Sequence, residues 1–226
     1  MKTFLSYFFY LGINWNFRIA SYVIWQEIKG EKKYRINTTG ANELKSMEKQ
    51  GIDISHATVY MPVTYFQLEE IFRELPRDQR KHFMDIGCGK GRALCVAAHH
   101  GYGKVTGIDF SEEFCLAAKK NLEITKEDFP SLTYTITTQD ASLSPIPLDV
   151  DCIFLFNPFD EVIMVRVVRS IMSSLKLHPR NLNLAYANPL YKKLFLEKGF
   201  TETYYSKRLK YLEMSILNFR PEKPEV

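Results

Sequence analysis

The chain has no Lys/Arg-rich block and no cysteine or histidine pattern suited to holding a metal. Its net charge is only +4, which permits an acidic or nucleic-acid partner but does not require one. The four cysteines contain no Cys-x-x-Cys pair and no metal-ligand spacing; they are Cys88, Cys95, Cys115 and Cys152. We therefore expect no metal site, and we expect reduced, mostly buried thiols in a cytoplasmic protein.

The first 30 residues also lack the features of a signal peptide and of a spanning helix. A signal peptide needs a basic start, a short apolar run and a small-residue cleavage site, and no clear set is present. A spanning helix needs about 20 apolar residues without a central charge, whereas Asn14, Asn16 and Arg18 interrupt this segment. The segment does carry apolar residues at three- and four-residue steps, which predicts an aromatic helix over residues 1–30. These residues are Phe4, Phe8, Leu11, Trp15, Ile19 and Tyr22.

Three interpretations of this aromatic helix stay open. It packs as a cover on the domain or forms a contact with a partner chain, as in a dimer; it lies on a membrane surface; or it spans the membrane. We favour the cover, and the excess of aromatic residues keeps a peripheral membrane contact as the next alternative.

A glycine-rich loop follows a short apolar strand at residues 84–92, which read Met-Asp-Ile-Gly-Cys-Gly-Lys-Gly-Arg. Alternating glycines let the backbone turn tightly and approach a ligand. A dinucleotide-binding oxidoreductase would need glycine where Arg92 stands, and a P-loop would need Ser or Thr where Gly91 stands. The remaining pattern, Asp-x-Gly-x-Gly-x-Gly, resembles motif I of the class I S-adenosylmethionine-dependent methyltransferases. The resemblance implies that Asp85, Gly87, Gly89 and Gly91 bind S-adenosyl-L-methionine.

A second acidic residue lies at a suitable distance from this loop. Residues 104–108 predict a buried strand that ends in Asp109, eighteen residues after Gly91. This separation is close to that of a carboxylate that holds ribose hydroxyls. Ser111, followed by two glutamates, predicts the start of a helix. The structural alternative is that Asp109 only begins the turn between this strand and the following helix.

Strand and helix patterns alternate regularly from His82 onward, which predicts an α/β fold with a doubly wound, mainly parallel sheet. The expected strands are 82–86, 104–108, 132–138, 151–156, 182–187, 200–205 and 212–219. The last two form an antiparallel hairpin, a further resemblance to the Rossmann-like methyltransferase fold. We expect three parts: the aromatic helix 1–30, a helical cap 31–80 and a cofactor-binding domain 81–226. The charged residues 29–33 predict a linker at the boundary between the first two parts.

Two further loops carry residues that the resemblance assigns to the site. After the third strand, Asp140 would accept a hydrogen bond from the adenine amino group, and the Ala141 N–H would meet a ring nitrogen. The alternative for Asp140 is a simple Asx turn. Upstream of motif I, the placement of Tyr60 is similar to that of residues that close over the cofactor in non-SET histone-lysine methyltransferases. Tyr60 is therefore a candidate lid contact.

The fourth strand ends in Asn-Pro-Phe-Asp at residues 157–160, which resembles motif IV of amino-group methyltransferases. The resemblance implies that Asn157 accepts hydrogen bonds from a planar amine and that the Phe159 ring stacks on it. The second proline of that motif is absent, which argues against a nucleic-acid base as the acceptor. The alternative is a helix start, with Asn157 as the cap. Asn188 and a following proline repeat the arrangement after the fifth strand.

The motifs together predict a methyltransferase whose acceptor, a small molecule or a protein rather than nucleic acid, presents a nitrogen nucleophile. The outer segments 34–40, 60–62, 157–160 and 186–189 resemble a bacterial subgroup of the same class. No His/Asp pair suited to act as a base is evident, and the sulfonium donor requires no metal. The non-enzyme alternative is a regulatory module that binds the cofactor without turnover, located at a membrane through residues 1–30.

Overall fold

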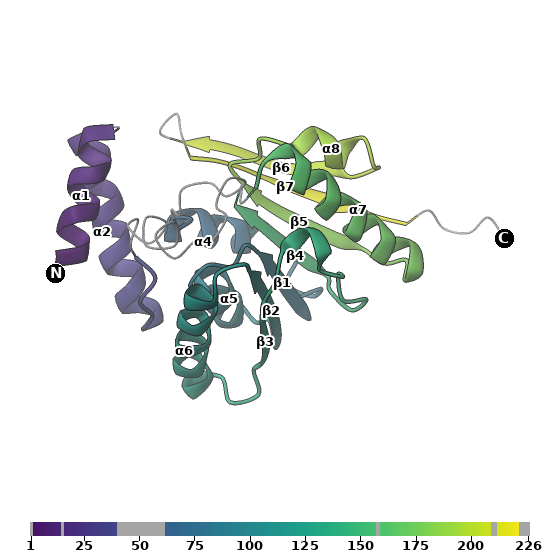
Figure 1. Cartoon of the computed structure of the whole chain (residues 1–226), viewed down its shortest axis with the longest axis horizontal. Coiled ribbons are helices and arrows are strands. Elements are labelled where there is room, and N and C mark those ends of the chain that lie inside the picture. Colours follow the sequence, from purple (N-terminus) through teal and green to yellow (C-terminus); the bar gives the residue numbers. More distant parts are fainter. Residues whose placement is uncertain (1, 15, 40–61, 157–158, 209–211, 222–226) are drawn as a thin grey trace.

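The computed structural model describes residues 2–14, 16–39, 62–156, 159–208 and 212–221, which are built around a seven-stranded sheet (Figure 1). The strands are β1 His82–Ile86, β2 Lys104–Asp109, β3 Thr133–Thr138, β4 Cys152–Phe156, β5 Leu182–Ala187, β6 Thr201–Arg208 and β7 Leu212–Phe219. Their order across the sheet is β3-β2-β1-β4-β5-β7-β6. Strands β1 to β5 are parallel, whereas β7 is antiparallel to both neighbours, so the predicted fold class is confirmed.

Helices cover both faces of the sheet. They are α1 Lys2–Asn14, α2 Phe17–Tyr34, α4 Tyr65–Glu74, α5 Arg92–His99, α6 Glu112–Asp128, the short 3-10 helix η1 Ala141–Leu143, α7 Glu161–Leu177 and α8 Lys192–Leu196. One core cluster joins α4, α5 and α6 to one face, and a second joins α7 and α8 to the other. Each face thus has its own apolar core, and the carboxyl ends of the parallel strands remain between the two layers.

The burial of each strand agrees with its place in the sheet. Every residue of β1 and β5 is buried, and the apolar run Cys152–Phe156 forms β4 between them. Strands covered on both faces need such continuous apolar runs. The edge strands β3 and β6 are mostly exposed or half-buried. All four cysteines are buried and free, as the sequence predicted.

Side-chain caps determine where the helices begin. Ser111 accepts a hydrogen bond from the Phe114 N–H at 3.2 Å and caps α6, as predicted. Helix α7 begins at Glu161, because Asp160 accepts from the Ile163 N–H at 3.0 Å. The structural alternative in which Asn157 caps this helix does not apply to α7, since Asp160 takes that place.

The second Asn-Pro pair is not a helix start either. Helix α8 begins only at Lys192, after Tyr191. Asn188 instead has a φ of 50°, in the left-handed region, and its N–H donates to the Glu213 carbonyl at 2.7 Å. Asparagine tolerates this conformation better than most residues. The pair therefore ends β5 with a sharp turn that is fixed against β7.

The N-terminal segment forms two helices rather than the single helix that the sequence predicted. Helices α1 and α2 pack side by side as a hairpin at one end of the molecule (Figure 1). The predicted linker at residues 29–33 is instead part of the last two turns of α2. In the described ranges no helix is long and apolar enough to cross a membrane. Residues 40–61 of the predicted helical cap lie outside the described residues.

A buried ion pair joins α2 to the sheet domain. Glu27 is 1% exposed and Arg92, the first residue of α5, is 3% exposed. Arg92 Nη1 donates to Glu27 Oε1 at 2.8 Å, and Nη2 donates to Oε2. The guanidinium also donates to Thr38 Oγ1 and to the Val63 carbonyl, and it lies 4.2 Å from the Tyr65 ring centroid. A cation at a helix N-terminus opposes the helix dipole, so the Glu27 carboxylate stabilises both the charge and its position.

We predict that Glu27→Gln lowers the free energy of unfolding by about 3 kcal/mol, because it leaves the Arg92 charge buried without its carboxylate. Urea denaturation followed by circular dichroism measures this change. The matched control is Glu127→Gln, which breaks an exposed ion pair with Arg35 and should cost less than about 1 kcal/mol. Equal losses in the two variants would contradict a structural role for the buried pair.

His100, at the end of α5, makes the fold sensitive to pH. Its ring stacks on Phe72 with a centroid distance of 4.9 Å and an interplanar angle of 13°. Burial, followed by the charge of Arg80, lowers the pKa of His100 from 6.5 to about 4. The unfolded chain therefore takes up a proton near pH 6.5, while the folded chain resists protonation until about pH 4. This histidine destabilises the fold as the pH falls between these two values.

We predict that His100→Gln reduces the loss of unfolding free energy between pH 7 and pH 5 by about 1 kcal/mol, after allowance for solvent screening of a half-buried ring. Urea denaturation of both proteins at the two pH values measures the difference. If the wild type and the variant lose the same free energy, the depressed pKa of His100 does not affect stability.

Candidate active site

The candidate site lies where the strand order reverses, between β1 and β4. In open α/β sheets, ligands bind at the carboxyl ends of the strands near this point. The glycine loop that follows β1 folds over the end of β2, because the Gly87 and Cys88 N–H groups both donate to the Ile108 carbonyl, at 2.8 and 2.9 Å. The loop is thus held by the neighbouring strand.

Asp109 connects three of the predicted segments. Its Oδ2 accepts from the Gly89 N–H at 2.8 Å, and its Oδ1 accepts from the Ser111 N–H at 3.0 Å. Its backbone carbonyl accepts from the Gln139 N–H at 2.9 Å, which brings in the loop after β3. The structure therefore places the motif I loop, the acid after β2 and the segment before Asp140 together. The turn that Asp109 begins is present too, so this carboxylate also has a structural role.

Asp85 and Asp109 form an acidic pair beneath the glycine loop. Both side chains are buried. Burial, and then the charge of Asp109, raises the pKa of Asp85 well above its usual range. Burial also raises the pKa of Asp109, but N–H donors from Gly89, Ser111 and Phe110 oppose the shift. The two carboxyl groups thus differ: Asp109 is stabilised as an acceptor, while Asp85 keeps its proton to higher pH.

The motif I glycines adopt the backbone that the sequence predicted. Gly87, Gly89 and Gly91 have φ angles of 84°, 51° and 79°, in the region that favours glycine. At Gly91 a Cβ atom would also lie 3.0 Å from the Cβ of Ala118 on α6. Glycine is required there both for the turn and for close packing of the loop on α6.

Asp140 and Ala141 follow β3, as predicted, and begin η1. Asp140 is exposed, and its Oδ1 accepts from the Ser142 N–H at 2.7 Å. This is the capping geometry of the structural alternative. Ala141 is buried in the core cluster beneath α7. The contacts of both residues with adenine remain predictions.

The acceptor side of the site is only partly described. Tyr60 and Asn157 lie outside the described residues. Phe159 is buried in the core cluster that joins α7 to the sheet, so its proposed stacking on an amine stays a prediction. Within the described part of the chain, no group of three or more His, Cys, Asp or Glu side chains could hold a metal ion.

Sequence reasoning missed three residues that support the glycine loop. Arg92 served only to exclude a dinucleotide site, and Glu27 was not considered. Asn121 of α6 donates to the Lys90 carbonyl at 2.9 Å and to the Asn37 carbonyl at 3.2 Å. The one available sequence signal was Arg92 itself, which stands at the start of a helix. A positive charge at that position opposes the helix dipole, so a nearby carboxylate is expected. The N-terminal extension therefore contacts the loop through both α5 and α6.

Comparison with known proteins agrees with this geometry. Residues 83–177 match the family model described as a methyltransferase domain. No curated protein matches the sequence.

Three solved structures share the fold at low identity. The PH0226 protein from Pyrococcus horikoshii OT3 has 15% identity and a TM-score of 0.53, and the alignment covers 84% of this chain and 99% of that one. An RNA methyltransferase from Salinibacter ruber, in complex with S-adenosyl-L-homocysteine, has 15% identity and a TM-score of 0.53, with 74% and 98% covered. The ribosomal protein L11 methylase from Lactobacillus delbrueckii subsp. bulgaricus has 14% identity and a TM-score of 0.50, with 68% and 77% covered.

The family match and the fold identify a class of protein. The sheet order, the antiparallel end and the glycine loop are those of a class I methyltransferase, and the predicted resemblance is confirmed. The match to the methyltransferase-domain model covers residues 83–177, which include the glycine loop, Asp109 and helix α7.

We predict that Gly91→Ala lowers the free energy of unfolding by about 2 kcal/mol, because the new methyl group meets Ala118 and the backbone is strained. The matched control is Gly101→Ala, where φ is also positive, at 97°, but no atom lies within 4 Å of the new Cβ. The control should cost only about 1 kcal/mol of backbone strain. Urea denaturation measures both, and identical losses would show that the contact between loop and helix has no energetic effect.

Proposed function

We propose that this chain transfers a methyl group from S-adenosyl-L-methionine to a nitrogen nucleophile on a small molecule or a protein. The observation that supports this proposal most directly is the Asp109 carboxylate, which lies at the carboxyl end of β2 and accepts from the Gly89 N–H at 2.8 Å. This is the arrangement in which an acidic residue and a glycine loop together bind a nucleoside.

The residues present fit such a cofactor. Gly87 and Gly89, both at positive φ, place no side chain between the loop backbone and a ligand at the strand ends. The Asp109 carboxylate is an acceptor suited to ribose hydroxyls, and Asp140 is an exposed acceptor suited to an exocyclic amine. The Salinibacter relative, with S-adenosyl-L-homocysteine bound, supports the same ligand for this chain.

Methyl transfer mainly requires that the acceptor atom is aligned with the methyl group of the cofactor. When bound, the cofactor supplies a methyl group on a sulfonium, which is already activated for displacement. The chain has to hold the acceptor in line and exclude water. A neutral amine needs its lone pair oriented and a later route for its proton to solvent, which requires no dedicated base.

The acceptor assignment draws on motif IV. Asp160 and not Asn157 caps α7, which removes the main structural explanation for an asparagine at position 157. A carboxamide oxygen there is suited to accept from an amine, as in the amino-group methyltransferases that the motif resembles. The left-handed turn at Asn188 ends the adjacent strand β5 and adds a second amide at the same edge of the sheet.

Calorimetric titration with S-adenosyl-L-methionine and S-adenosyl-L-homocysteine tests the cofactor. We predict binding by the wild type and a loss of at least about tenfold in affinity for Asp109→Ala, because the variant removes the ribose acceptor and releases Gly89. The control is Asp128→Ala, an exposed residue paired with Arg35, which should bind like the wild type. A folded wild type that binds neither compound would overturn the proposal.

Release of S-adenosyl-L-homocysteine in the presence of candidate acceptors separates an enzyme from a binding module. Small amines, acids, peptides and RNA are the acceptor classes to compare. Turnover with an amine, reduced by at least about tenfold in Asn157→Ala with unchanged cofactor affinity, is the expected result. Binding without turnover on any class would support the regulatory module instead.

A further inference from the structure

In the described residues, the α1–α2 hairpin contacts the domain through the C-terminal part of α2. Near the domain, Glu27 pairs with Arg92, and Gly30 lies so close to the Tyr65 ring that an added Cβ would overlap it at 2.1 Å. Tyr34 stacks on Tyr65 at a centroid distance of 5.6 Å. Farther out, the two helices of the hairpin pack on each other around a small core of Tyr7, Leu11, Ala20 and Val23. The outer part of the hairpin thus extends beyond the domain at a fixed orientation (Figure 1).

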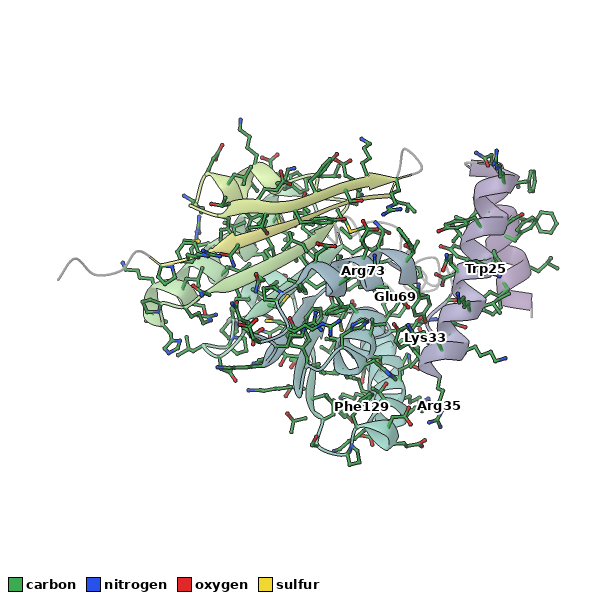
Figure 2. All side chains as sticks on the ribbon, turned by 180° about the vertical axis from the view of Figure 1, so that it is seen from behind. Trp25, Lys33, Arg35, Glu69, Arg73 and Phe129 are labelled. Atoms are coloured by element: carbon green, nitrogen blue, oxygen red, sulfur yellow. The ribbon has the colours of Figure 1, made fainter. Side chains whose placement is uncertain are left out.

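Large apolar side chains are concentrated on this outer part. Four of the five exposed aromatic side chains in the described residues belong to it, although it makes up about an eighth of the chain. Figure 2 shows rings that extend from the hairpin on the side away from the domain. The exposed apolar residues of the hairpin are Leu5, Phe9, Ile13, Phe17, Tyr22, Trp25 and Ile28. A soluble surface rarely gathers so many in one place without a binding partner.

The exposed residues follow the helical repeat. On α1, Leu5, Phe9 and Ile13 recur every four residues, and Ile13 is 77% exposed. On α2, the aromatic pair Tyr22 and Trp25 shares one stripe with exposed cations on either side. The hairpin therefore presents apolar stripes of the kind that enter an interface rather than scattered single residues.

The charges around these stripes have one sign. Residues 1–34 contain five cations and two carboxylates, and both carboxylates are directed inward. Glu27 pairs with Arg92, and Glu31 accepts from the backbone N–H groups of Thr38 and Thr39 at 2.8 and 2.7 Å. The exposed cations on α2 include Arg18, Lys29 and Lys32. Lys29 lies 5.0 Å from the Trp25 ring centroid, so charge and aromatic surface are adjacent.

We propose that the outer part of the hairpin, with its seven exposed apolar residues and these cations, docks on an anionic lipid surface. Trp and Tyr favour the headgroup layer, and lysine and arginine are attracted to acidic headgroups while their stems cover apolar surface. A second copy of the chain would bring the same cations against one another, which disfavours self-association through this face. In this proposal the two helices lie in the plane of the lipid surface, with their apolar side chains in the headgroup layer.

Flotation of the full chain with lipid vesicles tests the proposal without any cofactor, so its outcome is independent of the proposed function. We expect at least about tenfold stronger partitioning to phosphatidylcholine vesicles with about 30% phosphatidylglycerol than to pure phosphatidylcholine. Raising the salt from about 0.1 M to 0.5 M should weaken the binding, since the cations are exposed.

Two pairs of variants separate the apolar and charged contributions. Phe9→Ala with Trp25→Ala should reduce partitioning about tenfold, whereas Leu143→Ala with Leu177→Ala, which removes even more exposed apolar residues elsewhere, should not. Lys29→Glu with Lys32→Glu should also reduce partitioning about tenfold. Lys119→Glu with Lys120→Glu, the same charge change on α6, should leave it unchanged. Thermal unfolding verifies that each variant is folded.

Either of two results would overturn the proposal. One is equal partitioning to neutral and anionic vesicles, or none to either, by the folded wild type. The other is a dimer in sedimentation velocity that dissociates on Phe9→Ala with Trp25→Ala, together with no vesicle binding, which would assign the face to a second copy.

Discussion

Arg92 and Glu27 form an ion pair that is almost fully removed from solvent. This pair joins the N-terminal extension to the sheet domain. Arg92 directly follows the last glycine of the loop and begins α5, so its position is tied to the shape of the site. Glu27 lies on α2, so the same contact orients the N-terminal hairpin. A buried charge without its partner is strongly unfavourable, which means that loop, helix and extension are held in one arrangement.

The acidic pair beneath the glycine loop follows a different principle. Asp85 and Asp109 are both buried, but only Asp109 is described with backbone N–H donors at both oxygens. Those donors compensate for the loss of water, and the charge of Asp109 in turn raises the pKa of Asp85. One carboxylate is thereby stabilised as an acceptor, and the neighbouring carboxyl group can act as a donor. Two residues of the same type thus acquire different chemistry from their surroundings alone.

The N-terminal extension has a part that packs on the domain and a part that is exposed. From Glu27 onward it is a cover on the domain, with its carboxylate and its close contact at Gly30 buried against α5 and α4. Before Glu27 it is a hairpin that exposes large apolar residues, among them Phe9 and Trp25, beside basic ones. A rigid base with an exposed outer part can hold the methyltransferase domain at a set position relative to whatever the hairpin binds.

The sequence by itself determined the order of strands and helices and the motif I loop, because apolar runs and glycine spacing are local patterns. Local patterns offered Asn157 as the alternative cap of the following helix, whereas Asp160 caps α7, because the start of this helix depends on how the preceding loop packs. The ion pair between Glu27 and Arg92, which are 65 residues apart, could not be predicted from local patterns either. Only the tertiary structure brings such residues together, because burial and charge pairing depend on the packing of whole elements, which spacing along the chain does not encode.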